Sequence, residues 1–288
     1  MPNRRHALAN QAMLASIIAR TKAAMDLQRP ICIYALSKAH RVQVRFNNIN
    51  MEGMYQRGAA PRIHLSARRP LPRRAYKCAH ELGHHVFGHG SSIDDLRKDA
   101  KAKPWEDPKE FLADTFAGFV LMPTLGLRHA FASRSCNPEA TTPRQIFQVA
   151  CEFGVGYATL VTHLSQAVGM LSRSRAAALQ RATPKAIRAE MLNELSPIPL
   201  IIADQAWASP VLDAKVGTHL VLPANTQAAN DAVVPVRDLP AGRLPAATRN
   251  IMVRPCRGAR LSAAGFLLAV VLLRRLRHTE PGPPSTVW

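Results

Sequence analysis

Acidic residues, disulfide-type cysteine patterns and long apolar runs are all scarce in this chain of 288 residues. Its 19 Asp and Glu residues stand against 38 Lys and Arg residues, so the formal net charge is +19. This excess favours contact with an anionic partner, and nucleic acid is the first candidate. The five cysteines are odd in number and include no CxxC pair, which argues against a disulfide framework and favours a reducing, cytoplasmic location.

No stretch has the pattern of a secretion signal or a membrane span. Polar residues interrupt the apolar residues near the N-terminus, so we expect no cleaved leader. The longest apolar run, 263–273, is well short of the roughly 20 residues that a membrane helix needs. We expect a buried helix or strand there rather than an amphipathic surface anchor.

The spacing of apolar residues predicts an α+β fold in three parts. Residues 1–130 should form a domain with an N-terminal helix, 137–194 a helical unit, and 197–288 a small β-rich or irregular region. Helices are expected at 7–27, from Pro72 to Phe87, from Asp107 to Pro123, and at 145–152, 157–167 and 184–193. Strands are expected at 31–34, 42–46 and 63–65, and a loop at 91–109.

Residues 80–84 read HELGH, an HExxH motif inside a predicted helix. Residues four apart share one helix face, so His80 and His84 can direct two imidazoles at one ion. Zinc binds neutral imidazole nitrogens, and its catalytic sites keep a position open for water. Glu81 sits next to the first histidine and can act as the general base on that water.

A histidine-rich surface helix is the alternative to a metal site, because His85 and His89 follow the motif and short motifs also arise by chance. His89 is displaced by one residue from the third-ligand position of an HExxHxxGxxH site, so we interpret it as a cation at the helix C-terminus. Gly83 costs about 1 kcal/mol inside a helix. We therefore expect another element to pack closely against it.

A third metal ligand should come from a different element, and Glu110 is the best candidate. Asp114 lies one turn further along the same helix face, where it can hydrogen-bond a histidine ligand from outside. Glu110 is also three residues after Asp107, the position that closes a capping box. These residues alone leave both readings of Glu110 open.

Three stretches together resemble the ImmA/IrrE family of zinc metallopeptidases. Residues 79–85 resemble its AHELGH helix, 110–117 its E-x-x-A-(N/D)-x-F-A segment, and 121–123 the LLMP that closes that helix. The upstream stretch 54–68 resembles the strand before the active-site helix, so the match covers about residues 30–125. One departure is Tyr76-Lys77-Cys78, where Phe-Thr is common in the family; we expect Cys78 to face away from the metal and to pack in the core.

The resemblance implies a zincin-like core, in which an active-site helix packs on a small mixed sheet. It implies His80, His84 and Glu110 as ligands of Zn²⁺ and Glu81 as the catalytic acid and base. Family members cleave or antagonise helix-turn-helix repressors, so the resemblance also implies such a repressor as the protein partner.

The helices predicted on either side of Gly154 could form a helix-turn-helix unit that contacts DNA, with several arginines just after it. The alternative is a plain helical hairpin, because 157–166 contains no Arg or Lys for reading a major groove. In the tail, the spacing of Asp204, Asp213 and His219 indicates no site, and Trp207 is expected in a core or an interface.

Two functions are therefore consistent with the sequence. The first is a zinc endopeptidase, for which Tyr55, His64 and Tyr76 are candidate partners of the reacting oxyanion. The second is a basic transcription regulator that binds DNA or a repressor and has a non-catalytic metal site. Three protein ligands favour the enzyme, because structural zinc usually has four.

Overall fold

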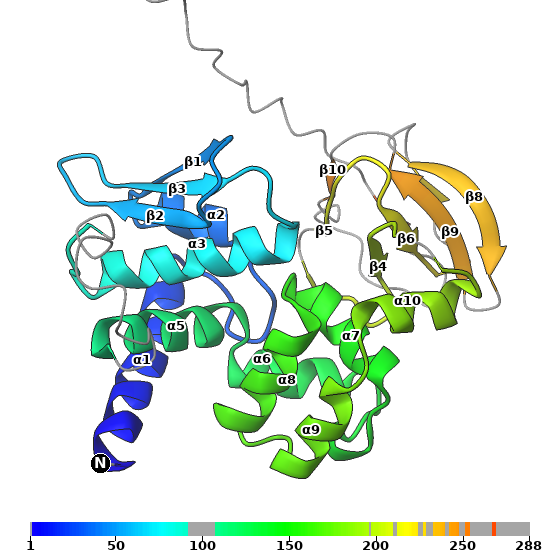
Figure 1. Cartoon of the computed structure of the whole chain (residues 1–288), viewed down its shortest axis with the longest axis horizontal. Coiled ribbons are helices and arrows are strands. Elements are labelled where there is room, and N and C mark those ends of the chain that lie inside the picture. Colours follow the sequence, from blue (N-terminus) through cyan, green and yellow to red (C-terminus); the bar gives the residue numbers. More distant parts are fainter. Residues whose placement is uncertain are drawn as a thin grey trace, which may run out of the picture.

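The structure is a computed structural model, and it describes residues 2–91, 107–195, 197–209 and 212–223, with strand segments at 227–228, 233–239, 242–247, 251–253 and 267–268. Figure 1 shows a small sheet above helices on one side, a group of helices below, and a second set of strands on the other side. The predicted α+β class is confirmed. The predicted loop at 91–109 and the apolar run at 263–273 fall mostly outside the described residues.

The first sheet has three strands in the order β1-β3-β2. Strand β1 (Gln43–Asn47) runs parallel to β3 (Arg62–Ser66), and β2 (Gly53–Gln56) runs antiparallel to it at the edge. Helices α2 (Ile33–Ala39) and α3 (Leu71–Val86) lie beneath the sheet in Figure 1. Ile63 and Leu65 of the central strand are fully buried, so the inner face of the sheet packs on these helices.

The strand predicted at 31–34 is wrong, because helix α2 begins at Ile33. Its β-branched and aromatic residues favour a strand locally, but Ile33 and Leu36 are buried on one helix face, and this packing overrides the local preference. The N-terminal helix α1 (Pro2–Lys22) begins earlier than expected and ends before Ala24, which has a positive φ of 52°.

Helix α5 (Pro108–Leu121) lies against α3, and the two helices pack closely at Gly83. A Cβ atom on Gly83 would lie 3.0 Å from the Cα atom of Ala113 and 3.2 Å from a ring carbon of Phe116. The close packing expected from the glycine is therefore observed. It brings the first turn of α5 next to the histidines of α3.

A buried arginine fixes α1 to α5. Arg20 has no exposed surface, and its Nε atom donates to the carbonyl oxygen of Val120 at 2.9 Å. Its Nη1 atom donates to the carbonyls of Asp26 and Arg29 at 2.6 and 2.9 Å. Burial lowers the pKa of Arg20 to about 10, although the nearby Asp26 charge opposes this. The charged side chain of Arg20 thus links the C-terminal end of α1 to α5 through backbone carbonyl groups.

The middle of the chain is helical: α6 (Thr124–Ala132), the short η2 (Pro138–Ala140), α7 (Pro143–Phe153), α8 (Tyr157–Gln166), α9 (Arg173–Gln180) and α10 (Pro184–Leu192). Thr142 and Gln145 form a capping box at the start of α7, and Gly154 ends α7 with a left-handed φ of 62°. Helix α8 is largely buried, and His163 on it lies 2.9 Å from the carbonyl oxygen of Met122 at the end of α5. This face of α8 therefore packs against α5.

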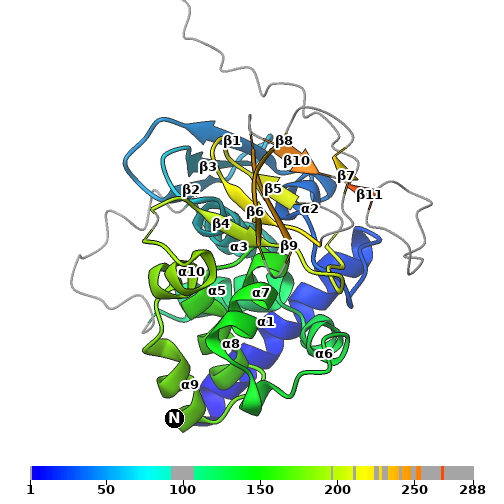
Figure 2. The same ribbon diagram turned by 90° about the vertical axis from the view of Figure 1, so that its right-hand side faces the viewer.

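The C-terminal strands confirm the expected β-rich region. A four-stranded sheet has the order β4 (Leu200–Ile202), β6 (His219–Val221), β9 (Gly242–Ala247) and β8 (Val233–Leu239). The short strands β5 (Leu212–Ala214) and β10 (Ile251–Val253) pair separately, as do β7 (Gln227–Ala228) and β11 (Leu267–Leu268). Trp207 is buried in a small cluster of this region, as expected. Seen from the side, β4 and β6 lie above α7 and α10 (Figure 2).

One core continues from α1 through α10 and includes Leu200, Val221 and Leu244 of the C-terminal strands. The three predicted domain boundaries stay a prediction. One helical stretch, Pro108–Ala132, is long and apolar enough to cross a membrane by length and composition, but 67% of its apolar window is buried inside the protein. That burial is typical of a core helix.

Candidate metal centre

Helix α3 directs two buried imidazoles toward one point. His80 and His84 are four residues apart, and only 5% and 1% of their surfaces are exposed. Their Nε2 atoms lie 3.1 Å apart. Two polar ring nitrogens that face each other inside a core need a shared partner. Among the described residues, the carboxylate of Glu110 is the group that contacts both of them.

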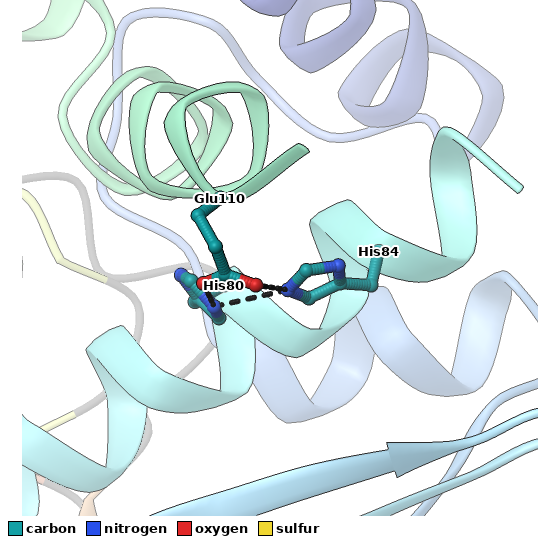
Figure 3. Close-up of side chains that lie close together, drawn as sticks. All are labelled: His80, His84 and Glu110. Atoms are coloured by element: carbon teal, nitrogen blue, oxygen red, sulfur yellow. Dashed lines mark hydrogen bonds and ion pairs between the residues drawn. The ribbon is translucent and has the colours of Figure 1, made fainter. Parts of the chain in front are cut away.

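Glu110 in the first turn of α5 supplies the third group (Figure 3). Its Oε2 atom lies 3.2 Å from Nε2 of His80, and its Oε1 atom lies 3.3 Å from Nε2 of His84. The helix is capped by Asp107, whose side chain accepts from the amide nitrogen of Lys109 at 2.8 Å. The carboxylate of Glu110 thus faces the histidines.

The donor set fits a divalent metal. One ligand atom from each of His80, His84 and Glu110 lies within 4.8 Å of the others. Tetrahedral donors bound at about 2.0–2.1 Å lie about 3.3 Å apart, close to the observed spacings. Two nitrogens and one carboxylate oxygen are the ligand types of a catalytic zinc site, and they leave a coordination position for water. This group could therefore bind a metal.

Each histidine has a partner at its other ring nitrogen. Nδ1 of His80 lies 2.7 Å from Oδ1 of Asp114, as expected for a carboxylate that orients the ring from outside. Nδ1 of His84 lies 3.0 Å from Nδ1 of His89. If both rings carry their proton at Nδ1, their Nε2 lone pairs are directed at the metal position.

This contact adds to the interpretation of His89 as a cation at the helix end, which stays a prediction. Helix α3 ends at Val86, and Gly88 takes a positive φ of 66°, which glycine adopts readily. The chain then turns back, and the amide nitrogen of His89 donates to the carbonyl oxygen of His84 at 2.9 Å. His89 is buried against the ring that it orients.

Glu81 is a fully buried carboxylate beside the two histidines. Nζ of Lys77, one turn earlier on α3, lies 2.8 Å from Oε1 of Glu81. This contact is an ion pair without hydrogen-bond geometry. Within the described part of the chain, Oε2 has no hydrogen-bond partner. Burying a carboxylate oxygen without a partner lowers the stability of the fold. Such a cost is typical of a residue with a chemical role.

The charges of the site are coupled. Burial lowers the pKa of His80, but its hydrogen bonds to Asp114 and Glu110 outweigh burial and raise it above the ordinary value. The contact with His80 is also the main reason that the pKa of Glu110 is lowered to about 2. Burial, with help from the His80 charge, lowers the pKa of His84 to about 4. His84 is therefore a neutral imidazole near pH 7, the form that binds metals.

The three candidate oxyanion partners lie in different places. The hydroxyl of Tyr55 lies 2.8 Å from Nδ1 of His85, and His64 is on the outer side of the sheet between Asn47 and Gln56. Tyr76 lies one turn before His80, and its hydroxyl donates to the carbonyl oxygen of Asp114 at 3.2 Å. Tyr76 thus contacts a residue that also orients His80.

Cys78 faces the core, as predicted. It has no exposed surface, and its sulfur lies 3.6 Å from the hydroxyl of Ser37 on α2. Burial raises the pKa of its thiol to about 12, which leaves it as an inert packing residue.

Comparison with known proteins identifies the region that holds this site. Residues 37–165 match the family model of the IrrE N-terminal-like domain. The match confirms the resemblance of this region to the ImmA/IrrE family. The match contains all of α3 and α5, and so every residue of the metal group.

A solved structure of a Mycobacterium tuberculosis transcriptional regulator is also similar, with 19% sequence identity and a TM-score of 0.36. That match covers 57% of this chain and 48% of the regulator, about half of its length. No curated protein matches the chain.

Proposed function

We propose that this chain is a zinc-dependent endopeptidase that cleaves and thereby inactivates a helix-turn-helix transcriptional repressor in the cytoplasm. One observation supports this most strongly. Two imidazole Nε2 atoms and one carboxylate face one another at 3.1–3.3 Å, with the buried carboxylate of Glu81 on the same helix. The match of residues 37–165 to the ImmA/IrrE family supports a role related to peptidases and gene regulation.

His80, His84 and Glu110 would hold the metal, with Asp114 and His89 fixing the two rings. When bound, zinc would supply Lewis acidity that activates water and stabilises negative charge on the scissile carbonyl. Glu81 takes the proton from the attacking water and delivers it to the leaving amine, so that the peptide bond breaks into a carboxylate and an amine. The ammonium of Lys77 keeps the Glu81 carboxylate in place beside the histidines.

The alternative function is a transcription regulator whose metal site is not catalytic. It is favoured by the basic composition but opposed by the donor set, since three protein ligands leave the coordination of a structural zinc incomplete. A regulator also gives no reason for the unpartnered Oε2 atom of the buried Glu81.

The test compares zinc content and cleavage in three variants of the full chain. Glu110→Ala should lose zinc, because it removes one of three ligands. Glu81→Gln should keep about one zinc per chain and lose about 10²- to 10⁴-fold in cleavage rate. Glu190→Ala, which removes an exposed carboxylate from α10, is the matched control and should change neither.

Cleavage is measured by mass spectrometry on a panel of purified helix-turn-helix repressors from the same organism. A native chain without zinc, or a Glu81→Gln variant that cleaves normally, would contradict the proposed enzyme. Zinc retained in every variant, with no cleavage of any repressor, would favour the regulator.

A further inference from the structure

The first sheet has two unlike faces. Strand residues alternate between faces, and Tyr55, Ile63 and Leu65 turn inward, where they are buried. Arg45 and Arg62 turn outward and are exposed. Helix α3, with the metal group, packs on the inner side (Figure 1). The outer side is therefore a separate surface.

Positive charge is concentrated in this part of the chain. Residues 37–91 contain ten Lys and Arg residues and two acidic residues, a net charge of +8, and one of those acids is the buried Glu81. The helical unit at 137–194 contains six Lys and Arg residues and four acidic residues, a net charge of only +2. The sheet region therefore carries a larger excess of positive charge than the helical unit does.

The two outward arginines are not neutralised by the protein. Within the described residues, neither Arg45 nor Arg62 forms an ion pair, and Arg45 contacts only the neutral Gln43, with Nη2 3.2 Å from Oε1. Arg69, just before α3, and Arg73, in the first turn of α3, differ because both pair with Glu52, at 2.9 and 2.8 Å. The outer face thus has charge that remains available to a ligand.

Among the described residues, no anionic group contacts the centre of this outer face. His64 lies between Arg45 and Arg62 in the strand register, and its ring nitrogens contact Asn47 at 3.2 Å and Gln56 at 3.4 Å, both neutral amides. Burial and the charges of Arg62 and Arg45 lower the pKa of His64. Amides and guanidinium groups together suit phosphate oxygens.

We propose that this outer face of the β1-β3-β2 sheet, centred on Arg45 and Arg62, binds the phosphate backbone of duplex DNA. Its outward strand residues include no Phe, Tyr or Trp, because Phe46 faces inward, where its ring meets that of Tyr34 with centroids 5.4 Å apart. Proteins that bind single strands use exposed aromatic rings to stack the bases. A basic face without such rings is suited to backbone contacts along a duplex.

The proposal stands apart from the metal chemistry, because the arginines and the metal group lie on opposite sides of the sheet. One consequence does rest on the proposed function: a peptidase held on DNA would be concentrated where its repressor substrates bind. A Glu81→Gln variant should bind DNA like the native chain, so failure of one proposal leaves the other testable.

The experiment measures binding of the full chain to a labelled duplex of about 30 base pairs by fluorescence anisotropy, over salt concentrations from about 50 to about 300 mM. Arg45→Ala/Arg62→Ala should weaken binding about tenfold or more and lower the salt slope by about two. Arg173→Ala/Arg181→Ala is the matched control, since it removes two exposed arginines from the helical unit. It should change affinity less than about twofold.

Zinc content and circular dichroism of both double variants should equal those of the native chain. Equal losses of DNA affinity in the two double variants would show that only the net charge matters. That result would overturn the proposal. A loss confined to Arg173→Ala/Arg181→Ala would place DNA on the helical unit instead. Absence of salt-dependent binding, or tighter binding to single-stranded RNA than to the duplex, would also overturn it.

Discussion

The metal group and the ion cluster around Arg134 both bury charged side chains, but they partner them differently. Arg134 makes two hydrogen bonds of 2.7 Å to Asp204 and an ion pair of 2.7 Å with Glu152, whose other oxygen accepts from the amide nitrogen of Ala208 at 2.9 Å. One cation lies between two carboxylates, and each of their four oxygens has a nitrogen within 2.9 Å, so this cluster joins the segment after α6 to α7 and to the C-terminal region. It has little left to offer a ligand.

In the metal group the same kinds of atom are left facing each other. The Nε2 atoms of His80 and His84 and the carboxylate of Glu110 are all potential metal ligands directed at one point, and among the described residues neither oxygen of Glu81 has a hydrogen bond. The comparison teaches that burial of charge alone does not mark a functional site. Three metal-binding atoms directed at one point are a stronger sign, because a bound ion would remove the cost of holding them together.

The largest expected effect is on the Arg134 cluster. Arg134→Met leaves Glu152 and Asp204 without their cation and should lower the free energy of unfolding by about 3–5 kcal/mol. Zinc affinity should not change. Chemical denaturation and zinc titration measure the two, with Arg128→Met, an exposed arginine on α6, as the control. An Arg134→Met variant that binds zinc more weakly but keeps its stability would contradict the distinction between the two clusters.

Gly83→Ala tests whether helix packing holds the metal group together. The added Cβ atom would meet Ala113 at 3.0 Å, so the variant should lose about 1–3 kcal/mol of stability and bind zinc more weakly as α5 moves away. Gly58→Ala, where nothing lies within 4 Å, is the matched control. Equal stability of the two variants would show that the helices do not need this contact.

Asp114→Ala and His89→Phe each remove the partner of one ligand ring. Both should weaken zinc binding about 10- to 100-fold, the range found when such outer partners are lost. Competition with a chromogenic chelator measures the affinities. If His89→Phe binds zinc as tightly as the native chain, the contact between His84 and His89 is only packing.

The smallest expected effect is that of pH on zinc affinity. The pKa of His80 is raised, so its proton competes with the metal already above pH 6.5, and affinity should fall about tenfold per pH unit below that raised pKa. Asp114→Ala removes a hydrogen bond that raises the pKa, so the fall should begin at lower pH. Zinc titrations at a series of pH values check both expectations. A fall at the same pH in both proteins would contradict the role of Asp114.

The local spacing of residues was enough to predict the helices that carry the site. His80 and His84 are four apart, and Asp107-Pro108 starts α5 as expected. The ring contact between His84 and His89 was missed because it depends on the turn at Gly88, although a glycine after a helix is the signal for such a turn. The ion pair of Lys77 with Glu81 was not predicted either, because Lys77 stood out in the sequence only as a departure from the family pattern.

Long-range packing explains the remaining differences. The edge strand β2 has four residues, among them Gly53, and its local pattern is too short to predict a strand. Its pairing with β3 becomes favourable only when Tyr55 is buried against the helices. The Arg134 cluster joins residues up to 70 positions apart, and no local pattern reports such a contact.

Arg20 also bears on where this protein can be divided. The family match begins at residue 37, yet the carbonyl group of Val120 inside that match is satisfied by a side chain from α1, before it. A fragment cut at the start of the match would lose the guanidinium group and uncover apolar surface of α5. The unit that folds on its own, and that protein engineers would move between chains as a piece, should therefore be expected to include α1.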